Sequence, residues 1–284
     1  MSIHPDTAVG TVRLLVSDLH QAREFYQRAI GFQAAELEDG TLVLGVPGER
    51  PLIELSGDPS AASLHRRATG LYHLAIRVPS RRDLALALVR LAEARWPLDG
   101  ASDHLVSEAL YLSDPDGNGI EIYRDRPCEQ WPRAGDRLEM ATLALDLRDL
   151  LGELDESSVP QPLAPAGTRI GHVHLQVADL AAAEAFYADI LGFEAMVRGY
   201  PGALFVSAGG YHHHIGLNTW HSLGAGAPPP GAIGLRSFAV ELPSQRELEV
   251  LLERVSSAGI EIDHGAGGAL IRDPAGNGIV LRSR

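Results

Sequence analysis

Histidine is the residue type whose number and spacing point most directly to chemistry in this chain of 284 residues. The sequence holds 12 histidines but a single cysteine, Cys128, which excludes a cysteine-rich metal site and an internal disulfide. Imidazole binds divalent metals and exchanges protons near neutral pH. Three histidines are consecutive in YHHHIGLNTW, residues 211–220. If this segment is a strand, alternation puts His212 and His214 on one face and His213 on the other.

A second segment that could carry chemistry is HLVSEALYLSDPDGNGIE, residues 104–121, which contains His104, Tyr111 and Glu121. The DPDGNG within it is typical of a hairpin turn, because Asp, Gly and Asn supply the backbone angles that such a turn needs. DPAGNG recurs at 273–278 without the accompanying tyrosine and glutamate. That second copy therefore predicts a turn alone.

Composition excludes several classes of function. Every basic residue is arginine, so a Schiff-base lysine and a P-loop are excluded. The net charge of −13 argues against nucleic acid, which needs a basic surface. The first ten residues have no signal-peptide core, and no apolar run approaches the ~20 residues that span a bilayer. We expect a cytoplasmic protein that acts on small molecules, with neither nucleic acid nor a membrane as a partner.

The chain repeats itself, and the repeats define the elements that must position these residues. GTVRLLVSDLHQAREFYQRAIGF (10–32) recurs as GHVHLQVADLAAAEAFYADILGF (171–193), and YHLAIRVPSRRDLALALVRL (72–91) recurs as RSFAVELPSQRELEVLLERV (236–255). Internal repeats decide the architecture before any other feature. Four repeats are predicted, at 8–57, 70–124, 169–220 and 233–284.

Each repeat predicts the element order βαβββ. An alternating apolar segment such as Val173, Leu175 and Val177 predicts a strand, and an amphipathic helix follows. The expected N-cap residues of the four helices are Asp18, Ser80, Asp179 and Ser244. Short alternating runs separated by Gly and Pro predict three further strands. One repeat of about 55 residues cannot bury both faces of its sheet. We therefore expect an α+β fold in which four βαβββ units form two paired curved-sheet barrels.

The length corresponds to about two domains. We predict a first pair of βαβββ units at 8–124, a linker at 125–168 with a short helix in LALDLRDLLGEL, and a second pair of units at 169–284.

This architecture resembles the vicinal oxygen chelate superfamily, which includes glyoxalases, fosfomycin-resistance proteins, bleomycin-binding proteins and type I extradiol ring-cleavage dioxygenases. The resemblance rests on the repeated signature of strand, DL, helix, FY and LGF, and it covers nearly the whole chain. In that superfamily the metal ligands lie on the first and last strands of paired units. The matching positions of the four repeats are, on the first strand, Thr11, His73, His172 and Ser237, and, on the last strand, Glu54, Glu121, Gly216 and Val280.

The resemblance implies a ligand set of His73, His172 and Glu121. Two imidazoles and one carboxylate form a facial set with open positions, which favours Fe(II), with Mn(II) as the alternative, in oxygen chemistry. Three protein ligands leave room for a bidentate substrate and for O2. A single histidine on a strand is more often structural, but these residues coincide with the ligand positions of the repeat.

Residues 104–121 are similar to a pattern shared by extradiol dioxygenases. The pattern runs from a histidine, across five to seven residues, to an apolar residue, a tyrosine, an acidic residue, a proline, a small turn and a glutamate. The matching residues are His104, Leu110, Tyr111, Asp114, Pro115, Gly117 and Glu121. Ser102 replaces the small or aliphatic residue that opens the pattern. The resemblance thus points to a type I extradiol enzyme of the catechol 2,3-dioxygenase kind.

The pattern lies in the second repeat here, whereas in the usual two-domain extradiol enzymes it lies in the fourth. We therefore predict that the second repeat pairs with the third to form the active barrel, so that His73 and His172 meet. The first and fourth repeats would form the inactive barrel. Pairing of one with two and three with four would instead separate His73 from His172 and leave His73, Glu121 and Glu54 as a glyoxalase-like set. A symmetry-related chain that contributes the missing ligand is a third arrangement.

The resemblance also implies roles for the residues around the metal. A catechol-type substrate binds through both oxygens and loses a proton, while O2 takes the remaining position. Tyr111 donates to a substrate oxygen, and His104 orients the substrate and relays protons. In extradiol enzymes a further histidine precedes a variable, an apolar and a small residue. His213 fits that pattern best, with His214 as the alternative.

The predicted function is extradiol cleavage of a catechol-type ring, with the catechol and O2 as partners and a homo-oligomer as the expected assembly. A glyoxalase-like metal isomerase or lyase would share the fold and the metal without needing Tyr111 and His104 at their spacing. A metal-free small-molecule-binding protein, as in drug resistance, would need no ligand set. Within the dioxygenases, a hydroquinone is the alternative substrate.

Overall fold

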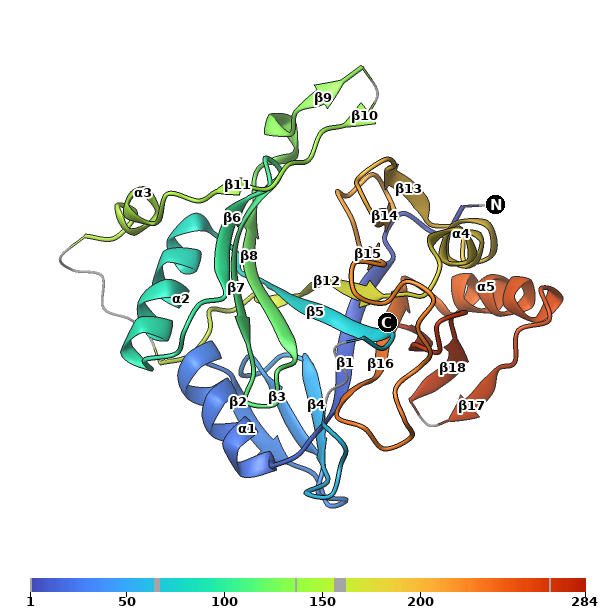
Figure 1. Cartoon of the computed structure of the whole chain (residues 1–284), viewed down its shortest axis with the longest axis horizontal. Helices are drawn as coiled ribbons and strands as arrows, with labels where there is room; N and C mark the ends of the chain where they lie inside the picture. Colours follow the sequence, from blue (N-terminus) through green and yellow to red (C-terminus); the bar gives the residue numbers. More distant parts are fainter. Residues whose placement is uncertain (1, 64–66, 136, 156–161, 266) are drawn as a thin grey trace. The chain divides into compact units, whose positions relative to one another are not determined.

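The computed structural model describes residues 2–63, 67–135, 137–155, 162–265 and 267–284. Its elements follow the predicted order of four βαβββ repeats (Figure 1). The first and third repeats are built alike, with a short helix that ends in a π-helical turn. The first contains β1 (Ala8–Val16), α1 (Leu19–Phe25), η1 (Tyr26–Ile30), β2 (Gln33–Glu36), β3 (Leu42–Gly45) and β4 (Ile53–Gly57). The third contains β12 (Arg169–Gln176), α4 (Leu180–Glu184), η3 (Ala185–Ile190), β13 (Glu194–Val197), β14 (Ala203–Ser207) and β15 (Ile215–Asn218).

The second and fourth repeats share a longer, regular α-helix. The second contains β5 (Gly70–Arg77), α2 (Arg81–Glu93), β6 (Gly100–Asp103), β7 (Ser107–Ser113) and β8 (Gly119–Asp125). The fourth contains β16 (Gly234–Leu242), α5 (Gln245–Ser257), β17 (Asp263–Gly265), β18 (Gly268–Arg272) and β19 (Gly278–Ser283). The α+β class and the βαβββ order predicted from the sequence are confirmed.

Polar caps start the helices where the sequence places them. The Asp18 carboxylate accepts from the backbone N–H groups of His20 and Gln21, and Ser80 accepts from that of Asp83. Asp179 and Ser244 cap their helices in the same way. Each cap satisfies N–H groups that the first helical turn leaves without a partner.

The π-helical turns of the first and third repeats are a feature that the sequence analysis did not predict. Each turn contains a fully buried tyrosine, Tyr26 or Tyr187. The Tyr26 hydroxyl donates to the Asp114 carboxylate at 3.4 Å, and the Tyr187 hydroxyl donates to Asp273 at 3.0 Å. The FY dipeptide of the repeat thus supplies a buried link to the DPxGNG turn of another repeat.

The strands form two large sheets whose order joins non-consecutive repeats. The eight-stranded sheet has the order β17-β18-β19-β16-β1-β4-β3-β2, and the nine-stranded sheet has the order β11-β6-β7-β8-β5-β12-β15-β14-β13. Because β5 lies next to β12 and β1 lies next to β16, the second repeat shares a sheet with the third, and the first with the fourth. The predicted pairing of repeats is confirmed.

The chain divides by its contacts into two compact units. Unit 1 comprises Met1–Leu14, Ala62–Tyr72 and Gly171–Arg284, and unit 2 comprises Leu15–Ala61 and His73–Ile170. The boundaries pass through β1, β5 and β12. The division of the sequence into 8–124, 125–168 and 169–284 therefore stays a prediction. Among the described residues, no helix is both long and apolar enough to cross a membrane.

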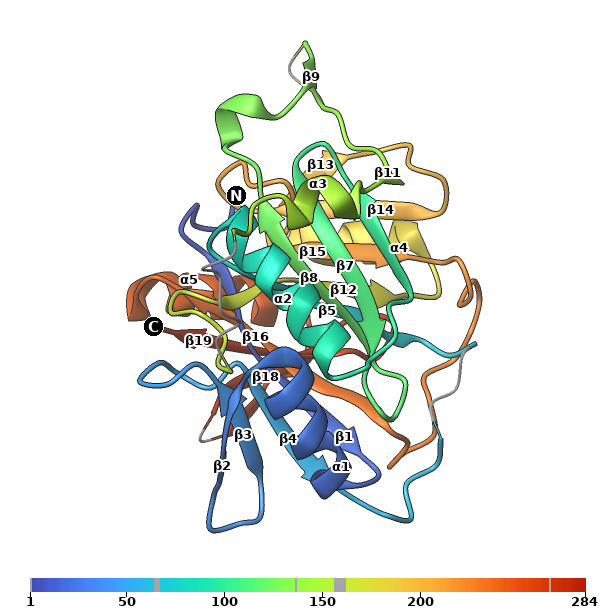
Figure 2. The ribbon, with the colours of Figure 1, turned by 90° about the vertical axis from the view of Figure 1, so that its left-hand side faces the viewer.

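Helices cover the sheets within each unit. In unit 1, α5 packs on β16 and β19, and α4 packs on β14 and β15. In unit 2, α2 packs on β8 and also contacts α3 (Leu147–Leu151), a helix of the linker (Figure 2).

The linker between the second and third repeats is largely ordered around that helix. It contains η2 (Cys128–Gln130), the hairpin β9 (Arg133–Ala134) and β10 (Arg137–Leu138), β11 (Leu143–Ala144) and α3. The predicted short helix is shorter than LALDLRDLLGEL, because Asp146 caps α3 and the residues before it join β6 as β11. Residues 136 and 156–161 of the predicted linker lie outside the described residues.

Candidate metal centre

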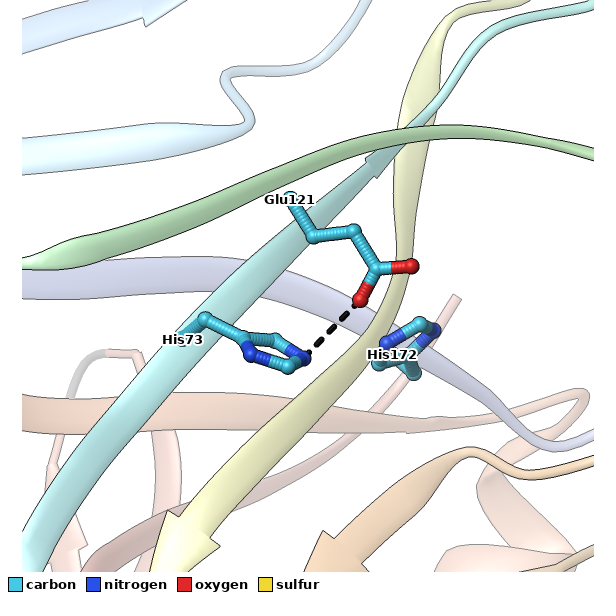
Figure 3. A group of neighbouring side chains, drawn as sticks. All are labelled: His73, Glu121 and His172. Atoms are coloured by element: carbon cyan, nitrogen blue, oxygen red, sulfur yellow. Dashed lines mark ion pairs between the residues drawn. The ribbon is translucent and has the colours of Figure 1, made fainter. Parts of the chain in front are cut away.

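His73 and Glu121 meet on one face of the nine-stranded sheet. β5 and β8 are parallel neighbours in which Ala75 is opposite Glu121, and alternation places His73 on the same face as Ala75. The His73 Nε2 atom lies 2.9 Å from a Glu121 carboxylate oxygen (Figure 3). Both side chains are buried, with 6% and 2% of their surface exposed. A buried carboxylate is stable when it is paired or when it binds a cation.

Small side chains beside this pair keep space on the same face. Ala75 and Ala109 are completely buried next to Tyr123, and Tyr111 packs against these three residues. Tyr111 lies directly opposite Glu121 in the antiparallel pairing of β7 and β8. Its ring centre is 5.6 Å from that of His73. The hairpin of β7 and β8 thus places the Tyr111 phenol beside the His73–Glu121 pair.

His104 lies at the end of β6 and holds the Tyr111 hydroxyl. The His104 Nε2 atom is 2.6 Å from the Tyr111 oxygen, and its Nδ1 atom is 2.8 Å from the backbone oxygen of Ala141 in the linker. His104 and Tyr111, both predicted from the sequence, are therefore in direct contact with one another. The contact with Ala141 was not predicted, because a backbone carbonyl leaves no signal in the sequence.

His172 lies on β12 and is 1% exposed. One donor atom from each of His73, Glu121 and His172 lies within 4.8 Å of the others, and all three side chains are buried (Figure 3). These three side chains are the group of potential metal ligands that is found among the described residues. Their donor atoms are two imidazole nitrogens and a carboxylate oxygen, the set that the resemblance to the superfamily implied.

The three consecutive histidines lie before the strand rather than in it. β15 begins at Ile215, so the prediction that strand alternation sorts His212, His213 and His214 between two faces was wrong. His213 is buried with its ring centre 4.0 Å from that of His172. The Nδ1 atoms of His212 and His213 are 2.8 Å apart.

His214 has a different environment from His213. Its Nδ1 atom accepts a hydrogen bond from the Ala208 backbone N–H at 3.2 Å and lies 2.9 Å from the Ser207 hydroxyl. The ring of His213, by contrast, lies beside that of His172, with 47° between the two ring planes. Of the two histidines, His213 is therefore the one that lies beside the His172 ring.

His174 was missed by the sequence analysis, although its spacing of two residues from His172 puts both on one face of β12. It is 4% exposed and lies opposite Gly216 of β15. A Cβ atom at Gly216 would come within 2.9 Å of the His174 ring. Gly216 thus occupies the position that Glu121 holds in the second repeat, and the imidazole of His174 covers it.

Glu54, the other acidic residue at a ligand position, lies in a different sheet. It is half-buried on β4 and opposite Val43 of β3, in the eight-stranded sheet, whereas His73 and Glu121 lie in the nine-stranded one. The alternative set of His73, Glu121 and Glu54 is therefore not assembled.

The DPDGNG turn joins β7 to β8 and fixes their register. Asp114 accepts from the backbone N–H groups of Asp116 and Asn118 and from the Asn118 side chain. Burial is the largest influence on its carboxyl and raises its pKa to about 6. The matching Asp273 is also buried, and its pKa is raised for the same reason. The turns were predicted, but their buried tyrosine partners were not.

Comparisons with known proteins agree with this architecture. The model of the family described as the glyoxalase/bleomycin resistance protein/dioxygenase superfamily matches residues 8–122 and 169–281. A protein of Bacillus subtilis (strain 168) named catechol-2,3-dioxygenase is 46% identical over 277 residues, which cover 96% of each chain.

Solved structures share the fold at low sequence identity. A crystal structure of a putative dioxygenase from Bacillus subtilis matches 100% of this chain and 86% of its own, with a TM-score of 0.66 and 14% identity. Glyoxalase I from Zea mays matches 97% of this chain and 92% of its own, with a TM-score of 0.57 and 16% identity. At these identities the likeness concerns the fold alone, since one fold serves many chemistries.

Proposed function

Because the chain belongs to the glyoxalase/bleomycin resistance protein/dioxygenase superfamily, we propose that it is an extradiol dioxygenase, which opens a catechol-type ring with O2 at a divalent metal. The observation that carries this proposal is the convergence of His73, Glu121 and His172 donor atoms within 4.8 Å of one another. The 46% identical relative that is named a catechol-2,3-dioxygenase supports the same substrate class.

The donor set fits a divalent metal of the iron type. Two buried imidazoles and one buried carboxylate carry a single formal negative charge and leave coordination positions for other ligands. We propose that His73, His172 and Glu121 hold Fe(II), with Mn(II) as the alternative. When bound, such an ion supplies a Lewis acid and a common binding point for a catechol and O2.

Tyr111 and His104 provide the proton chemistry on the His73 side. The Tyr111 ring lies 5.6 Å from the His73 ring, and its hydroxyl is 2.6 Å from His104 Nε2. A catechol oxygen near His73 and Glu121 would be within reach of this hydroxyl. We propose that Tyr111 orients that oxygen and that His104 exchanges a proton through it, a role that contributes typically 10²–10⁴-fold in enzymes.

His213 provides a second proton-exchanging group beside His172. Its Nδ1 atom makes a hydrogen bond with His212, so we propose that it acts through Nε2. His214 is held by Ser207 and Ala208, and we give it no part in the reaction. The two sides of the site would then each have one histidine that moves protons and one that binds metal.

Anaerobic reconstitution tests the function. The full chain is loaded with Fe(II) or Mn(II), and oxygen uptake is followed after addition of catechol or of hydroquinone. We expect uptake with catechol and formation of a ring-opened product. Uptake with hydroquinone alone would change the substrate class. A filled metal site without uptake on either compound would favour a glyoxalase-like isomerase or lyase, and the absence of metal binding would favour a small-molecule-binding protein.

We also propose a homo-oligomer. Within the described part of the chain, each of the two large sheets ends in strands that pair on one side, β2 and β17 in one sheet and β11 and β13 in the other. Such edges associate readily with other strands. Light scattering of the full chain would give the mass of the assembly, and a monomer at all concentrations would contradict this proposal.

A further inference from the structure

The linker between the second and third repeats reaches the Tyr111–His104 pair. β11 of the linker pairs antiparallel with β6, with Leu143 opposite Asp103 and Ala144 opposite Ser102. Just before β11, the backbone oxygen of Ala141 lies 2.8 Å from His104 Nδ1. The His104 ring therefore contacts the main chain of the linker through one nitrogen and the Tyr111 hydroxyl through the other.

This contact decides where the His104 ring carries its hydrogen. A carbonyl oxygen can only accept, so His104 must donate from Nδ1. In the neutral ring Nε2 is then an acceptor, so the Tyr111 hydroxyl donates to it. As a result, the lone pairs of the Tyr111 oxygen remain for a group on the substrate side. If the ring had the opposite tautomer, Tyr111 would accept from His104 and point its own hydrogen elsewhere.

Several hydrogen bonds hold the hairpin between β6 and β7, which carries His104. The His104 N–H donates to the backbone oxygen of Ser107 at 2.8 Å, and Leu105 has a φ of 71°, a left-handed conformation rare for such a side chain. The Leu105 N–H donates to the Asp103 carboxylate at 2.8 Å, and Asp103 also pairs with Arg126. These bonds hold the backbone of His104 independently of its contact with the linker.

A set of ion pairs clamps the linker against the second repeat. Arg81, at the start of α2, donates to Asp149 at 2.6 Å and to Glu153 at 2.9 Å on the linker, and to the buried Glu108 of β7 at 2.8 Å. Glu108 is 3% exposed and also binds Arg124 and Arg126. The ion pairs hold the pKa of the Arg81 guanidinium above its usual range. Leu150 of α3 is fully buried.

We propose that residues 141–153, here called the strap, are a positioning element of the active site that selects the His104 tautomer. The inference rests on the proposed function for its catalytic consequence. A catechol hydroxyl gives its proton to the Tyr111 oxygen while Tyr111 gives its own proton to His104 Nε2. One O–H bond of the substrate breaks, one N–H bond forms, and Tyr111 is unchanged. The Ala141 oxygen then stabilises the resulting imidazolium.

The test loosens the clamp from the strap side, where both side chains are exposed. In the double variant Asp149→Asn/Glu153→Gln, Arg81 keeps its buried partner Glu108, so the fold of the second repeat is retained. The matched control is Glu129→Gln/Glu139→Gln, which removes the same charge from exposed positions of the linker outside the clamp. Circular dichroism and metal content are expected to be unchanged in both variants.

The first measurement does not depend on activity. Long-range ¹⁵N–¹H spectra of the full chain without metal identify the His104 tautomer, with the signals assigned by their loss in His104→Gln. We expect the hydrogen on Nδ1 in the wild type and in the control, and averaging between the two tautomers in the clamp variant. A wild-type ring with its hydrogen on Nε2, or an unchanged tautomer in the clamp variant, would overturn the inference.

The second measurement separates this inference from the proposed function. With metal-loaded protein and catechol, we expect the clamp variant to lose about tenfold in kcat, since a misplacement of 1 Å costs on the order of 10²-fold. KM should change by less than about twofold, because the strap touches His104 rather than the metal ligands. Equal kcat values in the clamp variant and the control would count against the strap. Failure of the wild type to consume oxygen would instead count against the function.

Discussion

At the scale of single residues, the chemistry is concentrated in a few side chains that two neighbouring strands and one hairpin present. His73, Glu121 and Tyr111 share one face because β5, β8 and β7 are adjacent and in register. His172 comes from β12, the neighbour of β5.

Glu121→Gln should weaken metal binding while the fold is retained. The amide has almost the same shape as the carboxylate but has lost the negative charge that offsets a divalent ion, so we expect the affinity to fall by at least about tenfold. Metal content after gel filtration measures the effect. Glu54→Gln is the matched control, because Glu54 occupies the same position of the first repeat in the other sheet. Equal metal in the two variants would refute the ligand assignment.

Tyr111→Phe should keep the metal and slow turnover by about 10²-fold, because it removes only the hydroxyl. His104→Gln should have a similar effect. Since the two groups make one hydrogen bond of 2.6 Å, the double variant should be little slower than either single variant. Steady-state oxygen uptake at saturating catechol gives the three rates. Additive losses would show that Tyr111 and His104 act separately.

At the scale of elements, hairpins and helix ends explain why the site is where it is. The DPDGNG turn sets the register of β7 on β8, and thereby places Tyr111 opposite Glu121. The turn itself depends on the buried Asp114, which is linked to Tyr26 in the first repeat. A carboxyl so far from water has consequences for the stability of the fold at different pH values.

Asp114→Asn should remove a pH dependence of stability between about pH 4 and pH 6. Burial raises the Asp114 pKa in the folded protein from 3.8 to about 6, so the folded state holds a proton there that the unfolded state has lost. The stabilising contribution of the protonated Asp114 to the free energy of unfolding is fully present below pH 3.8. It is lost as the pH rises through about 6. At 1.36 kcal/mol per pKa unit the change is roughly 3 kcal/mol.

Urea unfolding of the wild type and of Asp114→Asn at a series of pH values measures this difference. The free energy of unfolding of the wild type, relative to that of the variant, should decrease as the pH is raised. Comparison of the two proteins cancels the other carboxyl groups, several of which have lowered pKa values and act in the opposite sense. A difference that is constant with pH would contradict the assignment of a raised pKa to Asp114.

At the scale of the whole molecule, the order of the strands makes the two halves of the chain depend on each other. A fragment of residues 169–284 would lack β5 and β1, the neighbours of β12 and β16. The exposed edges should make this fragment unfold or self-associate. Gel filtration and circular dichroism of the fragment, alone and after addition of a fragment of residues 2–155, would test this. A folded, monomeric 169–284 fragment would contradict it.

The sequence predicted this candidate ligand set because the resemblance to the superfamily assigns metal binding to two positions of a visible repeat. Alignment of the four repeats places His73, His172 and Glu121 at those positions, and the predicted pairing of repeats follows from the need to bring them together. Asp18 and Ser80 likewise mark helix starts, because each side chain accepts a hydrogen bond from a backbone N–H of the next few residues. Local rules of this kind are read reliably from sequence.

Other features escaped because they depend on tertiary contacts or on backbone atoms. The Ala141 oxygen touches His104 across 37 residues and has no side-chain signature. The run of His212, His213 and His214 was interpreted as a strand, since nothing in its composition shows that β15 begins only at Ile215. The hydrogen bond from Tyr26, in the π-helical turn, to the Asp114 carboxylate joins residues 88 positions apart, so no local pattern predicts it.

The nested order of the repeats has a consequence for how substitutions are tolerated along the chain. All candidate catalytic and metal-binding residues lie at positions 73–121 or 172–214, inside the two central repeats, while the flanking repeats carry Thr11, Glu54, Ser237 and Val280 at the matching ligand positions. Substitutions at those four positions should leave metal binding unchanged, although Thr11, Ser237 and Val280 are buried and contribute to the packing of their sheet. Random mutagenesis should therefore yield variants there that change stability but keep the metal, whereas variants at His73, Glu121 and His172 lose it.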